Sequence, residues 1–219
     1  MTAGPRQPKF RVVFFDVDST LVTIEGIDWL ARGNPSVAAL TEAAMTGEIP
    51  LQEVYARRLE MIRPARAAID ALGRQYIASL VDGAPETIER LQRENVDIHL
   101  VTAGIAQAIA PLATRLRIPP ASVHAVALRF GPDGEYEGFD ERSPLTRSGG
   151  KEDVVREVRA AAEGPAAFIG DGVSDLEAKP AVDLFIGFGG VQARERVKKE
   201  ADVFITARDL RAVLPHLVG

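Results

Sequence analysis

Two aspartates near the start of the chain, Asp16 and Asp18, follow four consecutive apolar residues, Val12 to Phe15. The apolar run predicts a short strand buried on both faces, as at the centre of a parallel sheet. Because the carboxyl ends of such strands open into the ligand crevice of an α/β sheet, both carboxylates should lie there. Like charges this close repel each other unless a cation neutralises them, and an all-oxygen site favours Mg²⁺. The alternative is a strand end followed by an ordinary Asp/Ser turn.

A hydroxyl and two small residues follow the next predicted strand. Thr102, Ala103 and Gly104 end a predicted strand at 96–101 and precede a predicted helix at 105–116. A turn of this kind at a helix N-terminus can bind an anion on its main-chain N–H groups. The pattern alone is weak evidence, because many strand–helix turns resemble it.

A lysine and two more aspartates occur at later element ends. Lys151 follows two glycines at the start of a predicted helix, where a cation is disfavoured by the helix dipole and is therefore better explained by function. Asp171 and Asp175 follow an apolar strand predicted at 165–169. Such ends converge on one edge of a doubly wound sheet, so the set would supply a nucleophile, a hydroxyl, a cation and metal ligands. Phosphoryl transfer requires these groups.

The elements that must position these residues alternate between strand and helix. Further strands are predicted at 184–188 and 203–205, and a hairpin at 125–139 around Gly131–Gly134. Helices are predicted at 51–62, 191–201 and 208–217. The alternation predicts an α/β fold with a doubly wound parallel sheet.

A block of short predicted helices interrupts this alternation at about 24–82. It comes directly after the first strand and its carboxylates, so it would lie over the crevice as a lid. The alternative is a helical bundle that only packs on the core. We expect a catalytic core of residues 1–22 and 86–219 and a small inserted helical cap of residues 23–85.

Composition restricts the function classes. The 219 residues carry a net charge of −5 and no cysteine, so there is no basic footprint for nucleic acid and no thiolate metal site. Met1 to Pro8 lacks the apolar core of a signal peptide, and no run reaches the length of a membrane span. We expect a cytoplasmic protein without membrane or nucleic-acid partners, either a monomer or a homodimer.

Taken together, the motifs resemble those of the haloacid dehalogenase superfamily of phosphohydrolases, which has a Rossmann-like core. They are D-x-D-S-T at 16–20, Thr102, Gly-Gly-Lys at 149–151 and G-D-G-x-S-D at 170–175. The resemblance is closer to the phosphoserine phosphatases, and it covers nearly the whole chain from Val12. The segments that carry this closer resemblance are Glu25–Asp28, Met45, Pro50, Arg58-Leu59, Gly134–Tyr136, Gly138–Glu141, Ser148–Lys151 and Phe185–Gly190.

The resemblance implies a role for each core residue. Asp16 would be the nucleophile that forms a phosphoaspartyl intermediate, and Asp18 the general acid and base. Mg²⁺ would be held by the Asp16 carboxylate, the Asp18 main-chain carbonyl and Asp171. Asp175 would act just outside this set, and Lys151 would offset charge on the phosphoryl group and on Asp16.

The resemblance also implies a small phosphomonoester substrate, O-phospho-L-serine, in the last step of serine biosynthesis. Glu25 would bind the substrate amine and Arg58 its carboxylate, which suits a planar bidentate partner. From the residues alone, Glu25 could equally be an acid in a helix first turn and Arg58 a solvated residue beside Arg57. The other substrate-binding residues would be Met45, Thr46, Thr102, Ala103, Gly104, Lys151 and Ser174.

One position departs from the family pattern. Phosphoserine phosphatases usually carry Ser-Gly-Gly where this chain has Thr102-Ala103-Gly104. Ala103 adds a methyl group and is largely confined to negative φ, so a glycine that needed positive φ could not be replaced without a different loop path. A phosphatase of the same superfamily acting on another small metabolite is therefore the first alternative.

The second alternative is a receiver-type signalling domain, which also carries a phosphorylated aspartate at a strand end. The length of the chain, its helical insertion and the second acid at Asp18, which suits turnover, argue against it.

Overall fold

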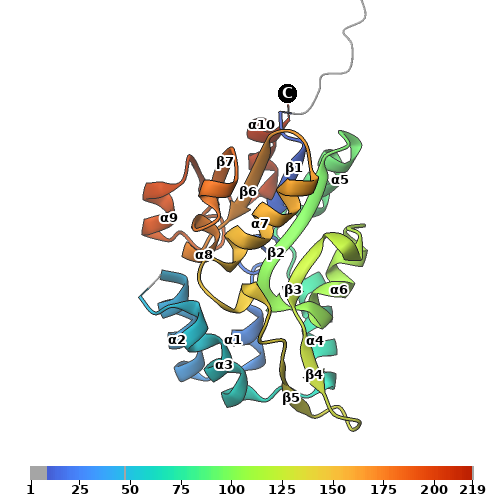
Figure 1. The fold of residues 1–219 in the computed structure, drawn as a ribbon, viewed down its shortest axis with the longest axis vertical. Coiled ribbons are helices and arrows are strands. Elements are labelled where there is room, and N and C mark those ends of the chain that lie inside the picture. The colour runs from blue at the N-terminus through green and yellow to red at the C-terminus, as the bar shows by residue number, and fades with distance from the viewer. Residues whose placement is uncertain (1–8, 47, 219) are drawn as a thin grey trace, which may run out of the picture.

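The computed structural model describes residues 9–46 and 48–218. Its centre is a six-stranded parallel sheet with the order β3-β2-β1-β6-β7-β8 (Figure 1). Strands that follow β1 in the sequence lie on both sides of it in the sheet, as in a doubly wound fold. This strand order confirms the predicted fold class. The strands are β1 Val12–Phe15, β2 Asp97–Ile105, β3 Val123–Val126, β6 Ala166–Gly170, β7 Leu184–Phe188 and β8 Val203–Ile205.

The predicted strand Val12–Phe15 is the central strand of this sheet. Its four residues are at most 2% exposed and pair with β2 on one side and β6 on the other. Phe14, Phe168 and Phe185 lie side by side on three neighbouring strands, with ring centroids 6.2 and 6.0 Å apart. Burying each such ring stabilises the fold by about 1.5–3 kcal/mol. This row fixes the register that carries Asp16 to the sheet edge.

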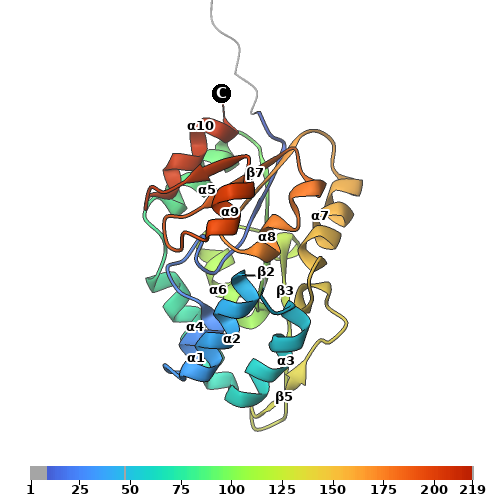
Figure 2. The ribbon, with the colours of Figure 1, turned by 90° about the vertical axis from the view of Figure 1, so that its left-hand side faces the viewer.

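Helices cover both faces of the sheet. In Figure 2, α5 and α10 lie to one side of it and α7 to the other. The structure ends the chain with a 3₁₀ turn at Leu210–Val213 and a short helix, where a single helix at 208–217 is predicted from the sequence. The helices are α5 Ala84–Arg93, α6 Ala106–Arg115, α7 Gly150–Ala161, α8 Val173–Leu176, α9 Glu195–Glu200 and α10 Leu214–Leu217.

The structure corrects the predicted end of the second strand. Thr102, Ala103 and Gly104 do not form a turn before a helix: β2 runs through them to Ile105. Its pairing with β3 shifts register between Val101 and Ile105, so this stretch is an irregular part of the strand. Thr102, Gly104 and Ile105 are buried and Ala103 is half-buried, and the anion-binding helix N-terminus expected here is replaced by strand backbone.

The predicted hairpin is present but shorter than expected. β4 Leu128–Phe130 pairs antiparallel with β5 Tyr136–Phe139 in a separate two-stranded sheet. Ala125 and Val126 belong instead to β3, the edge strand of the main sheet. The predicted single strand 125–130 is therefore divided between two sheets.

The helical insertion lies beyond the carboxyl ends of β1 and β2 (Figure 1). It contains α1 Gly26–Leu30, α2 Pro35–Thr46, α3 Leu51–Ile62 and α4 Arg66–Ala78. Its two connections to the core run side by side, joined by a bridge between Val22 and Leu80. The domain limits given above stay a prediction. Among the helices described, none combines the length and apolar character needed to cross a bilayer.

Candidate active site

Lys151 connects two of the predicted aspartates. Its Nζ lies 2.9 Å from Asp16 Oδ1 and also hydrogen-bonds Asp175 Oδ1, and it is 4% exposed. Burial alone would lower the pKa of Lys151, but the Asp16 and Asp175 carboxylates raise it above its ordinary value. The lysine is therefore a fixed positive charge beside the Asp16 carboxylate, not a solvated helix residue.

The start of α7 is what brings Lys151 to this place. A Cβ built on Gly150 would lie 1.7 Å from the Pro144 main-chain oxygen, so the helix can approach the preceding turn only with glycine here. On the cap side, Ser148 N donates to Gln52 Oε1 at 3.1 Å. The loop before Lys151 thus contacts both the core and α3.

Hydrogen bonds hold Asp171 and Asp175 in place at the end of β6. Asp175 Oδ2 accepts from the main-chain N–H groups of Asp171 and Gly172, at 3.1 and 2.9 Å. Thr20 Oγ1 donates to Asp171 Oδ1 at 3.0 Å, so the Thr20 hydroxyl helps to position the Asp171 carboxylate. Asp175 is engaged by Lys151 and two N–H groups, so it has little remaining capacity as a ligand.

The carboxylates fit a divalent cation. Oxygens of Asp16, Asp171 and Asp175 lie within 4.8 Å of one another, and all three residues are buried. Burial, then the neighbouring negative charges, raises the pKa of Asp171 well above its usual range and that of Asp175 to about 7. Asp16 Oδ1 and Asp18 Oδ1 are buried without an aligned hydrogen bond in the described part of the chain. Such an all-oxygen, excess-negative cluster suits Mg²⁺.

Asp18 stands apart from that cluster and faces the cap. Burial, followed by the charges of Glu25 and Asp16, raises its pKa well above the ordinary value, while the Tyr76 hydroxyl and the Gly26 main chain act in the opposite direction. A carboxyl group whose pKa is raised in this way can hold a proton near neutral pH. Asp18 therefore meets the requirement for a general acid.

The residues predicted to bind phosphate line the same cavity. Thr102 is 1% exposed, and its Oγ1 accepts from Gly104 N at 3.0 Å. Tyr55 of α3 donates its hydroxyl to the Ala103 main-chain oxygen at 2.9 Å. Neither Ala103 nor Gly104 has a positive φ. Alanine in place of the family's glycine is thus compatible with this backbone, and no altered loop path is needed.

Glu25 lies between the core and the cap. Its Oε1 accepts from Ser19 Oγ at 2.6 Å, and Arg194 Nη2 is 3.6 Å away. Burial raises the pKa of Glu25 to about 7, against the opposing effects of the Ser19 hydrogen bond and the Arg194 charge. Glu25 directly precedes α1, but its side chain lines the cavity.

Arg58 is buried, with 2% of its surface exposed, so a solvated role is wrong. Its Nη1 donates to Thr41 Oγ1 at 3.0 Å, and Thr41 in turn donates to Asp28. Its Nε has no aligned partner among the residues described. An unpaired guanidinium nitrogen at a cavity wall is suited to an anionic ligand group.

The two remaining cap residues are less informative. Thr46 Oγ1 donates to the Glu42 main-chain oxygen of its own helix at 2.9 Å. Met45 belongs to α2, but its side chain lies outside what the structure describes.

Most of the predicted residues enclose one small cavity of about 20 Å³. This is room for little more than a water molecule. Apolar walls come from Ile27 and Leu51. The predicted residues that line it are Asp16, Asp18, Glu25, Arg58, Thr102, Ala103, Gly104, Lys151 and Ser174.

Arg194 belongs to this site and is missed by the sequence analysis. Its guanidinium is 3.3 Å from Asp171 Oδ2 and 3.0 Å from Glu42 Oε2, besides its contact with Glu25. It precedes α9 in a segment predicted as helix from residue 191, and nothing in that spacing points to Asp171. Tyr76 of α4 is missed for the same reason.

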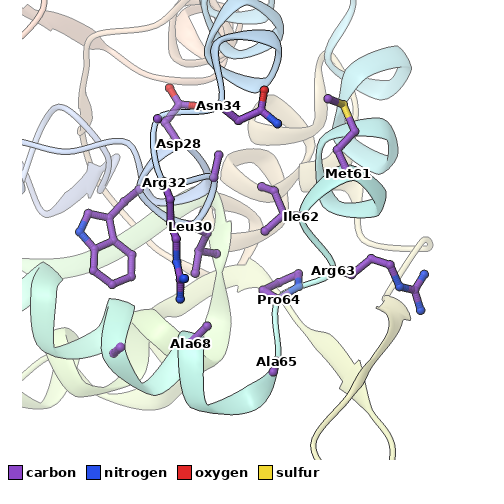
Figure 3. Close-up of a pocket in the computed structure, with 14 residues that line it drawn as sticks. Asp28, Leu30, Arg32, Asn34, Met61, Ile62, Arg63, Pro64, Ala65 and Ala68 are labelled. Carbon is purple, nitrogen blue, oxygen red and sulfur yellow. The ribbon is translucent and has the colours of Figure 1, made fainter.

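A larger cavity, of about 800 Å³, is lined by residues of the insertion (Figure 3). It is lined by α1, the turn after it, the end of α3 and the start of α4, including Leu30, Ile62, Pro64 and Ala68. Its walls are mostly apolar and include none of the predicted site residues. The chemistry therefore belongs to the small cavity.

Comparisons with known proteins give the family of the chain. Residues 13–178 match the family described as haloacid dehalogenase-like hydrolase. The human protein named phosphoserine phosphatase is 39% identical over 198 residues, covering 89% of this chain and 88% of its own. The chloroplastic phosphoserine phosphatase of Arabidopsis thaliana is 41% identical over 199 residues, covering 88% of this chain and 68% of its own.

A solved structure has the same overall fold as this chain. The structure described as a phospho-aspartyl intermediate analogue of phosphoserine phosphatase superposes with a TM-score of 0.80 at 25% identity, covering 95% of this chain and 99% of its own.

Proposed function

Because the chain belongs to the haloacid dehalogenase-like hydrolases and, within them, to the phosphoserine phosphatases, we propose that it hydrolyses O-phospho-L-serine to L-serine and phosphate. The observation that carries this proposal is the common cavity. It joins a nucleophile–lysine pair, Asp16 and Lys151, to a buried acid and a buried arginine, Glu25 and Arg58. Membership of this hydrolase family argues against the alternative of a receiver-type signalling domain.

The Asp16 carboxylate acts as the nucleophile. Its oxygen attacks phosphorus while the bond from phosphorus to the serine oxygen breaks, which gives a phosphoaspartate. Lys151, held 2.9 Å from Asp16 Oδ1, provides positive charge where the phosphoryl oxygens gather negative charge. Because Asp175 fixes the ammonium group, this charge needs no rearrangement during the reaction.

Asp16, Asp171 and the Asp18 main-chain carbonyl would hold Mg²⁺, with Asp175 orienting the cluster. The ion would supply charge neutralisation for the phosphoryl oxygens and for Asp16. Asp18 would give its proton to the departing serine oxygen and later take one from the attacking water. Its raised pKa suits the first of these steps.

Substrate selection would come from the insertion. Glu25 would pair with the substrate ammonium group and Arg58 with its carboxylate, while Thr102 and the main chain near Ala103 and Gly104 would contact phosphoryl oxygens. Met45, Thr46 and Ser174 remain proposed neighbours of the substrate. A cavity of about 20 Å³ cannot admit phosphoserine, so part of the insertion would have to move away from the cavity for substrate to enter.

The test is phosphate release from a panel of small phosphomonoesters, with and without Mg²⁺. We expect phosphoserine to have the highest kcat/KM and activity to need the metal. Turnover of 4-nitrophenyl phosphate without any turnover of phosphoserine would favour a different metabolite, the alternative left open by the Thr102-Ala103 departure from the family pattern.

A further inference from the structure

Tyr76 is a fully buried tyrosine that reaches the catalytic carboxylates from α4 of the insertion. It is 0% exposed, and its hydroxyl faces Asp18. An ordinary phenol keeps its proton at neutral pH, so this hydroxyl acts only as a neutral donor or acceptor.

Two glycines leave room for this hydroxyl. A Cβ built on Gly26 would lie 1.9 Å from the Tyr76 oxygen, and one on Gly104 would lie 3.5 Å from it. Gly26 follows Glu25, and Gly104 follows the predicted phosphate-binding residues. The two segments that border the cavity thus both approach the Tyr76 hydroxyl closely. Its place is fixed by the same main chain that forms the site.

Packing alone does not account for the hydroxyl group. Among the residues described, neither the Tyr76 oxygen nor Asp18 Oδ1 has an aligned hydrogen-bond partner, although both atoms are buried. Leaving a buried hydroxyl unpaired lowers stability, and phenylalanine would fill nearly the same space without this cost. An unpaired hydroxyl beside the side chain of a catalytic carboxyl group points to a contact used during the reaction.

We propose that Tyr76 is a positioning residue that donates to the Asp18 carboxyl group and directs the Asp18 proton toward the leaving oxygen of the substrate. This inference rests on the proposed function. As the bond from phosphorus to the leaving oxygen breaks and the bond to Asp16 forms, the proton of Asp18 passes to the leaving oxygen. The Tyr76 hydroxyl then stabilises the Asp18 carboxylate that remains.

The place of Tyr76 in α4 ties this contact to the core. A Cβ built on Gly73 of the same helix would lie 3.2 Å from the Ala108 main-chain oxygen of α6, so α4 packs closely on a core helix. This packing holds the Tyr76 hydroxyl near Asp18.

The experiment compares two leaving groups in the Tyr76→Phe variant. Phosphoserine releases a poor alkoxide leaving group that needs a proton, whereas 4-nitrophenyl phosphate releases a stable phenolate that does not. We expect kcat/KM for phosphoserine to fall by about tenfold to a hundredfold, within the range that positioned proton transfer supplies. The kcat/KM for 4-nitrophenyl phosphate and the inhibition constant of inorganic phosphate should stay within about twofold of their values in the unmodified protein. Losing a positioned proton transfer would have a larger effect than this.

Tyr136→Phe is the matched control. Tyr136 is also a buried tyrosine whose hydroxyl has no aligned partner in the part of the chain described, but it lies in β5 and does not line the small cavity. The control should leave the ratio of the two kcat/KM values unchanged. Both variants should unfold at a temperature no lower than that of the unmodified protein, since neither loses an aligned hydrogen bond and each removes an unpaired buried hydroxyl.

Equal losses on both substrates in Tyr76→Phe would overturn the proposal, because they would indicate a structural role or a role in phosphate binding. An unchanged kcat/KM for phosphoserine would overturn it as well. If the unmodified protein did not hydrolyse phosphoserine, the proposed function would fail. The leaving-group comparison, run with whichever alkyl phosphate the protein accepts, would still decide the role of Tyr76.

Discussion

The carboxylate of Asp16 is in contact with the one cation that α7 carries into the cavity, Lys151. Asp16→Asn keeps the size of this side chain but removes its charge and most of its nucleophilicity. We expect kcat to fall by about four orders of magnitude or more, as for other removed nucleophiles, with the fold retained by circular dichroism. Asp153→Asn, at a half-exposed aspartate of the same helix, should retain activity. Surviving Mg²⁺-dependent turnover in Asp16→Asn would refute its assignment.

We predict that Glu25 makes the affinity for phosphoserine depend on pH. Because burial raises the pKa of this acid to about 7, it is neutral below that pH and charged above it. Only the charged form attracts the ammonium group of phosphoserine. We expect KM for phosphoserine to rise about tenfold for each pH unit below 7, as for any site that requires one deprotonated group.

The comparison substrate for this pH effect is phosphoglycolate, which lacks the amine but shares the phosphate titration. Its KM should show no extra rise at low pH, and Glu25→Gln should abolish the difference between the two substrates. A difference that persists in Glu25→Gln would mean that another group is responsible.

Arg58 and Arg57 provide a matched pair on one helix, since Arg58 is buried and Arg57 is exposed. Arg58→Ala should raise KM for phosphoserine by about one to two orders of magnitude, because a charge-assisted hydrogen bond contributes about 1.5–3 kcal/mol. It should barely change hydrolysis of 4-nitrophenyl phosphate, and Arg57→Ala should change neither. Equal losses on both substrates would assign Arg58 to the fold or to the phosphate site.

At the scale of elements, the start of α7 depends on how closely it approaches the turn at Pro144–Thr146. A methyl group on Gly150 would meet the Pro144 oxygen at 1.7 Å, and main chain cannot yield as a flexible side chain can. We expect Gly150→Ala to lower the free energy of unfolding by about 1–3 kcal/mol, the usual cost of overpacking, and to reduce kcat by displacing Lys151.

Gly33→Ala is the control that distinguishes the clash at Gly150 from ordinary backbone strain. Gly33 has φ +80° but nothing within 4 Å of an added Cβ, and it lies outside the small cavity. It should lose some stability with unchanged kcat. A Gly150→Ala variant with full activity would mean that α7 can shift without moving Lys151.

Elements with a strong local pattern are well predicted from the sequence. The bounds of β1, α3, β7 and β8 agree with the prediction, because continuous apolar runs or a helical stripe mark them. The extension of β2 through Thr102-Ala103-Gly104 could not be predicted in this way. Ala103 and Gly104 have little strand propensity. The stretch is held instead by pairs with β3 on either side of it, at Val101 and Ile105, and by the hydrogen bond from Tyr55 of α3.

The same distinction separates the predicted site residues from the missed ones. Asp16, Lys151 and Asp171 stand at element ends whose convergence follows from the sheet topology. Arg194 and Tyr76 enter the site through contacts with residues distant in the sequence, Asp171 and Asp18, and their local sequence shows only a helix. Tertiary packing alone places them.

For the whole molecule, the excess of buried negative charge predicts strong stabilisation by metal. Asp16, Asp18, Asp171 and Asp175 are each at most 9% exposed, with Lys151 and Arg194 as the cations in contact with this cluster. A ligand at a hundredfold excess over its Kd stabilises the folded state by about 2.7 kcal/mol. We expect Mg²⁺ to raise Tm by about 5–10 °C over an EDTA-treated sample, given the usual 2–4 °C per kcal/mol for a domain of this size.

Asp171→Ala should remove most of this increase in Tm, and calorimetry should show weakened Mg²⁺ binding. An equal increase in Tm for Asp171→Ala and the unmodified protein would place the ion elsewhere.

The central position of β1 has a consequence for biosynthesis. Among the described strands of its sheet this one is made first, and its two hydrogen-bonding neighbours begin far along the chain, at Asp97 and Ala166. On the ribosome, the Val12–Phe15 segment therefore emerges long before either partner exists, and such exposed apolar segments invite aggregation or chaperone binding. The insertion that follows is also made before either partner, so for this whole period the nascent chain carries an apolar strand without its hydrogen-bonding neighbours.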